Sequence, residues 1–123
     1  MDKLQEFREY RERMNEKILA EGDRATKRFF SLDSYAYRPG ALDCKTKELL
    51  GLVASAVLRC NDCIAYHIIR AVQEGATDDE IKETLSIALI VGGSIVIPHL
   101  RYAYDLLDQA RQAQAEGHLE ELE

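Results

Sequence analysis

Residues 49–58 carry almost only apolar side chains, and this run is the feature that most constrains how the chain can fold. Asp43 precedes the run at a distance expected of a residue that caps the start of a helix. A helix that is apolar nearly all round has to be buried on most of its sides. We therefore expect the rest of the chain, or neighbouring subunits, to surround this helix.

The part of the chain before that run predicts two helices. Apolar side chains recur mostly at intervals of three and four from Leu4 to Ile18, with charged residues between them, which is typical of an amphipathic helix. Asp23 can cap a second helix, which has to end before Pro39 because the residue before a proline avoids the helical conformation. We therefore expect residues 1–39 to form N-terminal helices.

The second half of the chain predicts three more helices. One extends from Cys60 to Gln73, and a glycine at position 75 stops it. Thr77 and Glu80 have the spacing of a capping box at the start of the next helix, and Pro98 begins or kinks the last one. No stretch has the convincing pattern of a strand. The predicted fold is all-α, a bundle of about six helices.

Length, composition and charge limit the possible functions. The 123 residues are 46% apolar, which suits a single domain over residues 1–123. Residues 105–123 hold six acidic side chains against one arginine, so five of the six excess negative charges lie there, and we expect an acidic tail over residues 112–123. No basic patch remains for nucleic acid, and no apolar run reaches the roughly 20 residues that span a bilayer. Since the start of the chain is unlike a signal peptide, we expect a soluble, cytoplasmic protein without nucleic-acid or membrane partners.

Two cysteines and a histidine form the motif that most directly indicates chemistry. In a helix, Cys60, Cys63 and His67 stand at i, i+3 and i+7, within roughly 60° of one face. A helix start and a nearby imidazole both favour the thiolate, which is the reactive form of cysteine. The spacing of the cysteines also allows a reversible disulfide, because one sulfur can attack the other after oxidation. The motif therefore indicates a redox pair.

Other interpretations of these residues stay open. Buried cysteines are ordinary small apolar residues, and a single histidine on a helix face is more often structural than functional. Zinc would accept the three side chains as ligands, but no second C-x2-C or histidine pair supplies a fourth, and we expect neither a metal nor a cofactor. Outside the motif we interpret Cys44 as a packed residue near a helix start, His99 as a helix-start residue and His118 as part of the tail.

Glu48, eleven intervening residues, Cys60-x2-Cys63, three more residues and His67 together form a signature. It resembles that of the carboxymuconolactone decarboxylase superfamily and, within it, the AhpD-like alkylhydroperoxidase branch; the resemblance covers about residues 40–108. It implies an all-helical subunit built around a helical hairpin that carries the C-x2-C-x3-H motif, and assembly into trimers or hexamers. Because Glu48 would face away from Cys60 on one continuous helix, a turn just before Cys60 has to fold two helices together.

The same resemblance implies an enzyme of the peroxiredoxin type, a thiol-dependent peroxidase or disulfide oxidoreductase. Glu48 and His67 would form a proton relay, Cys63 would be the thiol that is deprotonated, and Cys60 would be its disulfide partner. The implied partners are a peroxide or disulfide substrate and an external dithiol or redox protein that donates electrons. Asp62 stands between the cysteines, where its charge either disfavours a thiolate and weakens activity toward peroxides, or complements the helix dipole.

Two other functions compete with this one. A lactone decarboxylase or related isomerase would use His67 or His99 as an acid or base, with the cysteines as bystanders. A non-catalytic, oligomeric binding or redox-sensing protein would not turn over substrate at all. Loss of thiols with peroxide, followed by turnover once a dithiol is supplied, separates the first function from these two.

Overall fold

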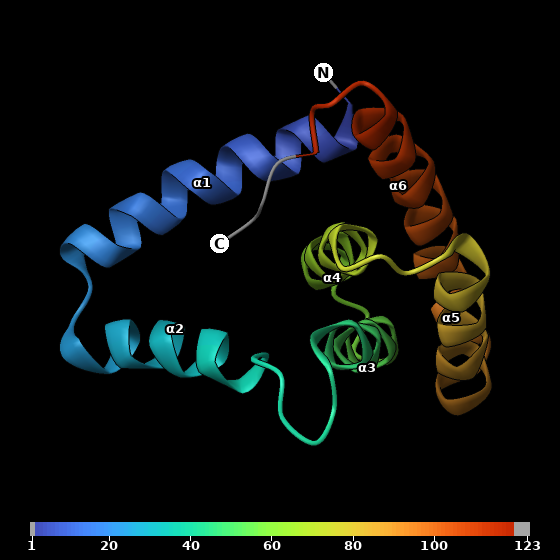
Figure 1. Ribbon diagram of the computed structural model, residues 1–123, viewed down its shortest axis with the longest axis horizontal. Coiled ribbons are helices and arrows are strands. Elements are labelled where there is room, and N and C mark those ends of the chain that lie inside the picture. Colours follow the sequence, from blue (N-terminus) through green and yellow to red (C-terminus); the bar gives the residue numbers. More distant parts are fainter. Residues whose placement is uncertain (1, 120–123) are drawn as a thin grey trace.

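The structure is a computed structural model that describes residues 2–119, and Figure 1 shows its arrangement. Every regular element in this range is a helix and none is a strand, so the all-α prediction is confirmed. The elements in chain order are α1 (Lys3–Glu21), α2 (Arg24–Ala36), α3 (Cys44–Val57), α4 (Asn61–Gln73), α5 (Asp78–Gly92), the short 3-10 helix η1 (Ser94–Val96) and α6 (Ile97–Ala115).

Three helices start at the capping residues that the sequence indicated. The carboxylates of Asp23 and Asp43 accept hydrogen bonds from backbone N–H groups three residues later, at 2.9 and 2.8 Å. Thr77 and Glu80 form a reciprocal capping box with hydrogen bonds of 2.9 and 3.1 Å. Each bond satisfies an N–H group that a helix start would otherwise leave unpaired. Local sequence therefore sets where α2, α3 and α5 begin.

α3 and α4 form the helical hairpin that the family resemblance implied (Figure 1). After α3 ends, Arg59 takes a positive φ of 61°, and the N–H of Cys60 donates to the carbonyl of Ser55 at 3.0 Å. Because this turn is so short, the two helices have to pack against each other as neighbours. The apolar side chains of the hairpin that are 0% exposed are Leu52, Ala56, Ile64, Ala65, Ile68, Ile69 and Ala71.

α5 and α6 cover the hairpin on the side opposite α1 and α2 (Figure 1). α5 packs mainly on α3, and α6 packs mainly on α4. Gly92 ends α5 so close to η1 that a Cβ atom there would lie 2.5 Å from the Val96 side chain, and Gly93 has a φ of 80°. Glycine is therefore required where the chain turns toward α6. Pro98 lies in the first turn of α6, so it begins this helix rather than kinking it.

α1 and α2 form an arm that the rest of the chain buries very little. α1 leads away from α6, and α2 returns toward α3 (Figure 1). Leu4 is the only buried residue of α1, and α2 has none. Lys47 of α3 fixes the end of α2, since its Nζ donates to the carbonyls of Ala36 and Arg38 at 2.8 and 2.7 Å. The large exposed apolar side chains of the arm are Tyr10, Ile18, Leu19, Phe29, Leu32 and Tyr35.

The apolar run over residues 49–58 is covered only in part by this chain. Leu52 and Ala56 are fully buried, but Leu50 and Leu58 are 54% and 75% exposed. The run had two possible sources of cover, its own domain or neighbouring subunits. The chain itself covers Leu52 and Ala56, but it leaves Leu50 and Leu58 without cover.

The predicted acidic tail begins within a helix. α6 continues to Ala115, so the first residues of the tail are helical. Beyond α6, the carbonyl of His118 accepts a hydrogen bond from Arg8 at 2.7 Å, which ties this segment to α1. The part of the predicted tail at residues 120–123 lies outside the described residues. None of the helices in residues 2–119 combines the length and the apolar character needed to cross a membrane.

Candidate functional site

The motif cysteines lie where α4 begins. Cys60 is the N-cap of α4, and its Sγ accepts a hydrogen bond from the N–H of Cys63 at 3.2 Å. A disulfide joins the two residues, whose Cα atoms are 5.3 Å apart. Cys60 has an extended backbone, so the predicted start of this helix at Cys60 was wrong by one residue. Cys63 and His67 therefore share a helix face one turn apart, while Cys60 reaches Cys63 from the capping position.

Glu48 of α3 meets His67 of α4 inside the hairpin. Its Oε1 atom lies 2.8 Å from Nδ1 of His67, and the residue is only 1% exposed. Because Glu48 is buried, it is not an exposed acid that merely complements the dipole at a helix start. A carboxylate bonded to Nδ1 makes that nitrogen the donor and leaves Nε2 as the atom that can accept a proton. The hairpin thus builds a carboxylate–imidazole pair one helical turn from Cys63.

Arg70 is a second partner of the buried carboxylate, and the sequence pattern did not single it out. Its Nε lies 3.5 Å from Oε2 of Glu48, the oxygen that His67 does not use. Burial lowers the pKa of this guanidinium, but the charges of Glu48 and Glu74 outweigh burial and raise the pKa overall. The one feature of the sequence that could have indicated Arg70 is its place as a basic residue three positions after His67 on a largely apolar helix. Glu48 is therefore held between an imidazole and a cation.

Two tyrosines and a glycine surround the imidazole of His67. The ring centroids of Tyr37 and Tyr66 lie 5.5 and 5.1 Å from that of His67. A Cβ atom on Gly51 would come within 2.7 Å of both the His67 ring and the Tyr37 hydroxyl, so the site has room only for glycine here. Burial, followed by the charge of Glu48, raises the pKa of Tyr37 to about 12. Tyr37 thus lies beside the imidazole as a neutral phenol.

His99 contacts the motif from α6. Its Nδ1 lies 2.8 Å from Oδ1 of Asn61, the first residue of α4. His99 is in the first turn of α6, in agreement with its interpretation as a helix-start residue. It also links α6 to the segment between the two cysteines, a contact that the sequence did not indicate.

Cys44 lies apart from the motif, as expected. It is the first residue of α3, it is half-buried, and its Sγ lies 3.6 Å from a terminal nitrogen of Arg70. Burial, followed by the charges of Glu74 and Glu48, raises the pKa of its thiol, although Arg70 opposes this rise. A raised pKa makes a thiol less reactive at neutral pH. Cys44 thus fits a packed residue better than a redox residue.

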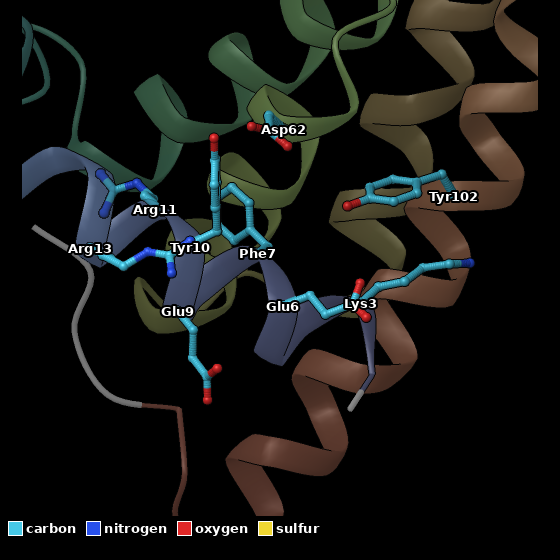
Figure 2. Close-up of a pocket in the computed structure, with 9 residues that line it drawn as sticks. All are labelled: Lys3, Glu6, Phe7, Glu9, Tyr10, Arg11, Arg13, Asp62 and Tyr102. Atoms are coloured by element: carbon cyan, nitrogen blue, oxygen red, sulfur yellow. The ribbon is translucent and has the colours of Figure 1, made fainter.

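A groove of about 680 Å³ lies beside the motif, between α1 and the start of α4. Figure 2 shows the rings of Phe7 and Tyr10 from α1, the ring of Tyr102 from α6 facing them, and Asp62 at the edge formed by α4. Asp62 is exposed in the first turn of α4, a position where an acid complements the helix dipole. The groove therefore borders the start of α4, the helix whose first turn holds Cys63.

Fold and site together define a class of protein: an all-helical chain with a dithiol at a helix start and a buried carboxylate–imidazole pair beside it. Among residues 2–119, no three His, Cys, Asp or Glu side chains are grouped in a way that could hold a metal ion. The chain belongs to the carboxymuconolactone decarboxylase family, whose family model matches residues 23–109. This match begins before the predicted region of resemblance, which covered about residues 40–108, and so it includes α2.

Solved structures of the family resemble nearly the whole chain. A family protein from Thermotoga maritima, suggested to take part in an antioxidative response, is 59% identical; the TM-score is 0.89, with 94% of this chain and 99% of that chain covered. A family protein from Legionella pneumophila, solved in its apo form, is 29% identical with a TM-score of 0.83 and covers 89% and 98% of the two chains. The uncharacterized protein 4 in the cox locus of Paracoccus denitrificans is 32% identical over 81 residues, which are 66% of this chain and 73% of that protein.

Proposed function

We propose that this protein is a thiol-dependent peroxidase or disulfide oxidoreductase in which Cys60 and Cys63 are the redox pair. The observation that carries the proposal is their disulfide, one helical turn from His67, whose Nδ1 is bonded to the buried Glu48. Two thiols provide two electrons, and the imidazole provides a proton acceptor. The suggested antioxidative role of the Thermotoga maritima relative supports the same chemistry.

The proposed cycle has three steps. First, a motif thiolate attacks one oxygen of a peroxide, ROOH; the O–O bond breaks, the sulfur becomes a sulfenic acid, and the leaving alkoxide takes a proton to give ROH. The second thiol then attacks this sulfur, so a disulfide forms and water leaves. Finally, a dithiol donor reduces the disulfide by two thiol exchanges and is itself released as a disulfide. With a disulfide substrate, thiol exchange replaces the first two steps.

The two cysteines receive different support in this cycle. A thiolate at Cys60 would lie at the N-cap, where the first N–H groups and the dipole of α4 stabilise negative charge. A thiolate at Cys63 would lie one turn from His67, which would take its proton while Glu48 stabilises the imidazolium. Following the family resemblance, we propose that Cys63 is the thiol deprotonated by the relay and that Cys60 closes the disulfide.

Peroxide consumption in the presence of a small dithiol tests this function. The unaltered protein should consume peroxide catalytically, whereas Cys60→Ser and Cys63→Ser should each abolish turnover. Cys44→Ser is the matched control and should leave turnover unchanged. A peptide map of the oxidised protein should show the loss of two hydrogens within the peptide that contains both motif cysteines. Full turnover in both single motif variants would contradict the proposal.

A lactone decarboxylase is the competing proposal, because the matched family is named for that activity. His67 or His99 would then act as the acid or base, and the sulfurs would take no part. Such a reaction would survive Cys60→Ser and Cys63→Ser together, so lactone turnover by this double variant separates the two proposals. The disulfide beside the carboxylate–imidazole pair favours the thiol chemistry.

We also propose that the functional form is a homo-oligomer, a trimer or a hexamer. Leu58, Ile90 and Val91 are 75%, 82% and 67% exposed, and the arm adds further exposed apolar side chains. A soluble monomer rarely leaves large apolar patches uncovered. Further copies of the chain would supply the cover that the apolar run at residues 49–58 still lacks.

A further inference from the structure

A buried carboxylate in the hairpin has two basic partners. Glu48 is 1% exposed, and its two oxygens face different groups: Nδ1 of His67 at 2.8 Å and Nε of Arg70 at 3.5 Å. The side chains of both partners are also largely buried, at 12% and 16% exposure. At this depth a charge is tolerated only when an opposite charge balances it. Which partner provides that balance decides the protonation of His67.

The guanidinium of Arg70 is fixed by its other contacts. One terminal nitrogen donates to Gln73 at 2.9 Å, and the other donates to Glu74 at 3.0 Å and lies 3.6 Å from Sγ of Cys44. These contacts hold Nε toward Glu48. A guanidinium does not lose its proton in proteins, so Arg70 is a permanent cation, whereas an imidazole gains or loses its charge.

We propose, building on the function proposed above, that Arg70 is a positioning residue that keeps His67 free to act as a base by balancing the charge of Glu48. With Arg70 in place, a cation that Glu48 shares with the more exposed Glu74 already lies against the buried carboxylate, and the imidazole can stay neutral and accept a proton from a thiol. Without Arg70, the buried carboxylate is balanced only when the Glu48–His67 pair takes up a proton from water. His67 would then already carry a proton and could not accept one from a thiol.

Other ionisable groups around the pair do not provide this balance. Burial and the charge of Glu48 raise the pKa of both Tyr37 and Tyr66, so these phenols stay neutral. The guanidinium carbon of Arg11, on α1, lies 4.7 Å from the centroid of the Tyr66 ring. The ionisable groups that act on this cluster from the packed helices are Arg11, Asp33, Tyr37, Cys44, Tyr66 and Glu74. The acids of this set would add negative charge, whereas Arg70 places a cation against Glu48.

An NMR titration of the imidazole groups tests the proposal on the full chain. In Arg70→Met the Glu48–His67 pair should take up its proton at a higher pH than in the unaltered protein, with the midpoint moved upward by about one pH unit or more. Arg70→Lys should keep the midpoint close to the original value, because an ammonium group also provides a cation. Arg28→Met, which removes the same charge from an exposed position of α2, is the matched control and should change nothing.

The proton could reside on either member of the pair, so the infrared C=O stretch of a carboxylic acid is recorded as well. In folded Arg70→Met, an unchanged His67 midpoint together with no new carboxylic-acid band would overturn the proposal. If Arg70→Met does not fold, the double variant Glu48→Gln with Arg70→Met is the test of the proposal. Because it removes both charges, it should regain the helical circular dichroism spectrum. A double variant that stays unfolded would mean that Arg70 acts through packing alone, and the proposal would be rejected.

The titration needs neither peroxide nor dithiol, so the two proposals can fail separately. A shifted midpoint in a protein without peroxidase activity would support the role of Arg70 in charge balance and reject the proposed function. Normal peroxidase activity with no shift in Arg70→Met would support the function and reject the role of Arg70.

Discussion

Helices α2 and α4 have the same length and are both amphipathic, yet they use their apolar faces in opposite ways. α4 buries six of its thirteen residues within the chain, whereas α2, also thirteen residues long, buries none. The difference arises because α4 follows α3 through a tight turn and is covered by α6, while α2 contacts the rest of the chain mainly at its ends. An amphipathic pattern therefore sets which face is apolar but not what covers it. The candidate site is built on the covered helix.

Matched leucine substitutions should give the largest difference in stability between the hairpin and the arm. Leu52→Ala removes a side chain that is 0% exposed in the hairpin, and it should lower the free energy of unfolding by about 2–5 kcal/mol. Leu32→Ala makes the same chemical change at 63% exposure in the arm, and it should cost less than about 0.5 kcal/mol. Urea denaturation at the lowest workable protein concentration measures both. Equal losses would mean that the arm is as well packed within one chain as the hairpin is.

At micromolar concentration the arm should behave as covered surface, because the proposed homo-oligomer would bury it. Light scattering should then give at least a trimer of the 14.0 kDa chain. Phe29→Ser together with Leu32→Ser should move the mass toward that of one chain, since these side chains are 68% and 63% exposed in a single copy. Lys27→Ser, on the same helix, is the control and should leave the mass unchanged. A monomer in the unaltered protein would contradict the expectation of oligomers.

An alkaline titration of the tyrosines tests whether Tyr37, at the end of α2, is buried against the hairpin. Burial and Glu48 raise the pKa of Tyr37 to about 12, so the folded state favours its neutral phenol. This contribution to stability is complete below about pH 10, the ordinary pKa of tyrosine, and is lost as the pH rises through about 12. Tyr37→Phe should remove one tyrosine from the part of the tyrosinate absorbance curve that titrates last. If the unaltered protein and Tyr37→Phe gave identical curves at the highest pH, Tyr37 would be exposed to solvent instead.

The smallest effect is expected at Asp62, between the cysteines. Asp62→Asn removes an exposed negative charge beside the motif and should speed alkylation of the reduced thiols at neutral pH by about two- to fivefold, because an exposed charge contributes at most about 1 kcal/mol. Asp79→Asn, in the first turn of α5, is the control for a lost helix-start acid. Slower alkylation of Asp62→Asn would mean that Asp62 supports the helix start more than it opposes a thiolate.

Features that depend on near neighbours could be predicted from the sequence. Asp43 and Thr77 cap helices through bonds to residues three positions away, so the chain carries these signals locally. The contact between Glu48 and His67 was implied by the family resemblance, and such a contact requires the hairpin that the structure shows. Their roles in proton transfer stay predictions.

Features that depend on how separate helices meet could not be predicted. His99 contacts Asn61 across 38 positions of the chain, and no local pattern marks either residue as a partner. Tyr37 reaches His67 only because Lys47 fixes the end of α2 against α3. Arg70 looks like an ordinary charged residue near a helix end until α3 brings a buried carboxylate to it. The start of α4 was misplaced for a different, local reason, since a cysteine is not a usual capping residue.

The central claim is that Glu48 and His67 control the protonation of a motif thiol. The rate of thiol alkylation against pH in the reduced protein measures this control most directly, with circular dichroism to check that the helices survive. Glu48→Gln should lower the rate at neutral pH, because a neutral amide no longer stabilises an imidazolium beside the thiolate, and His67→Ala should lower it further. A rate–pH profile that is unchanged in both variants would contradict the claim and leave Cys60 and Cys63 as a simple dithiol.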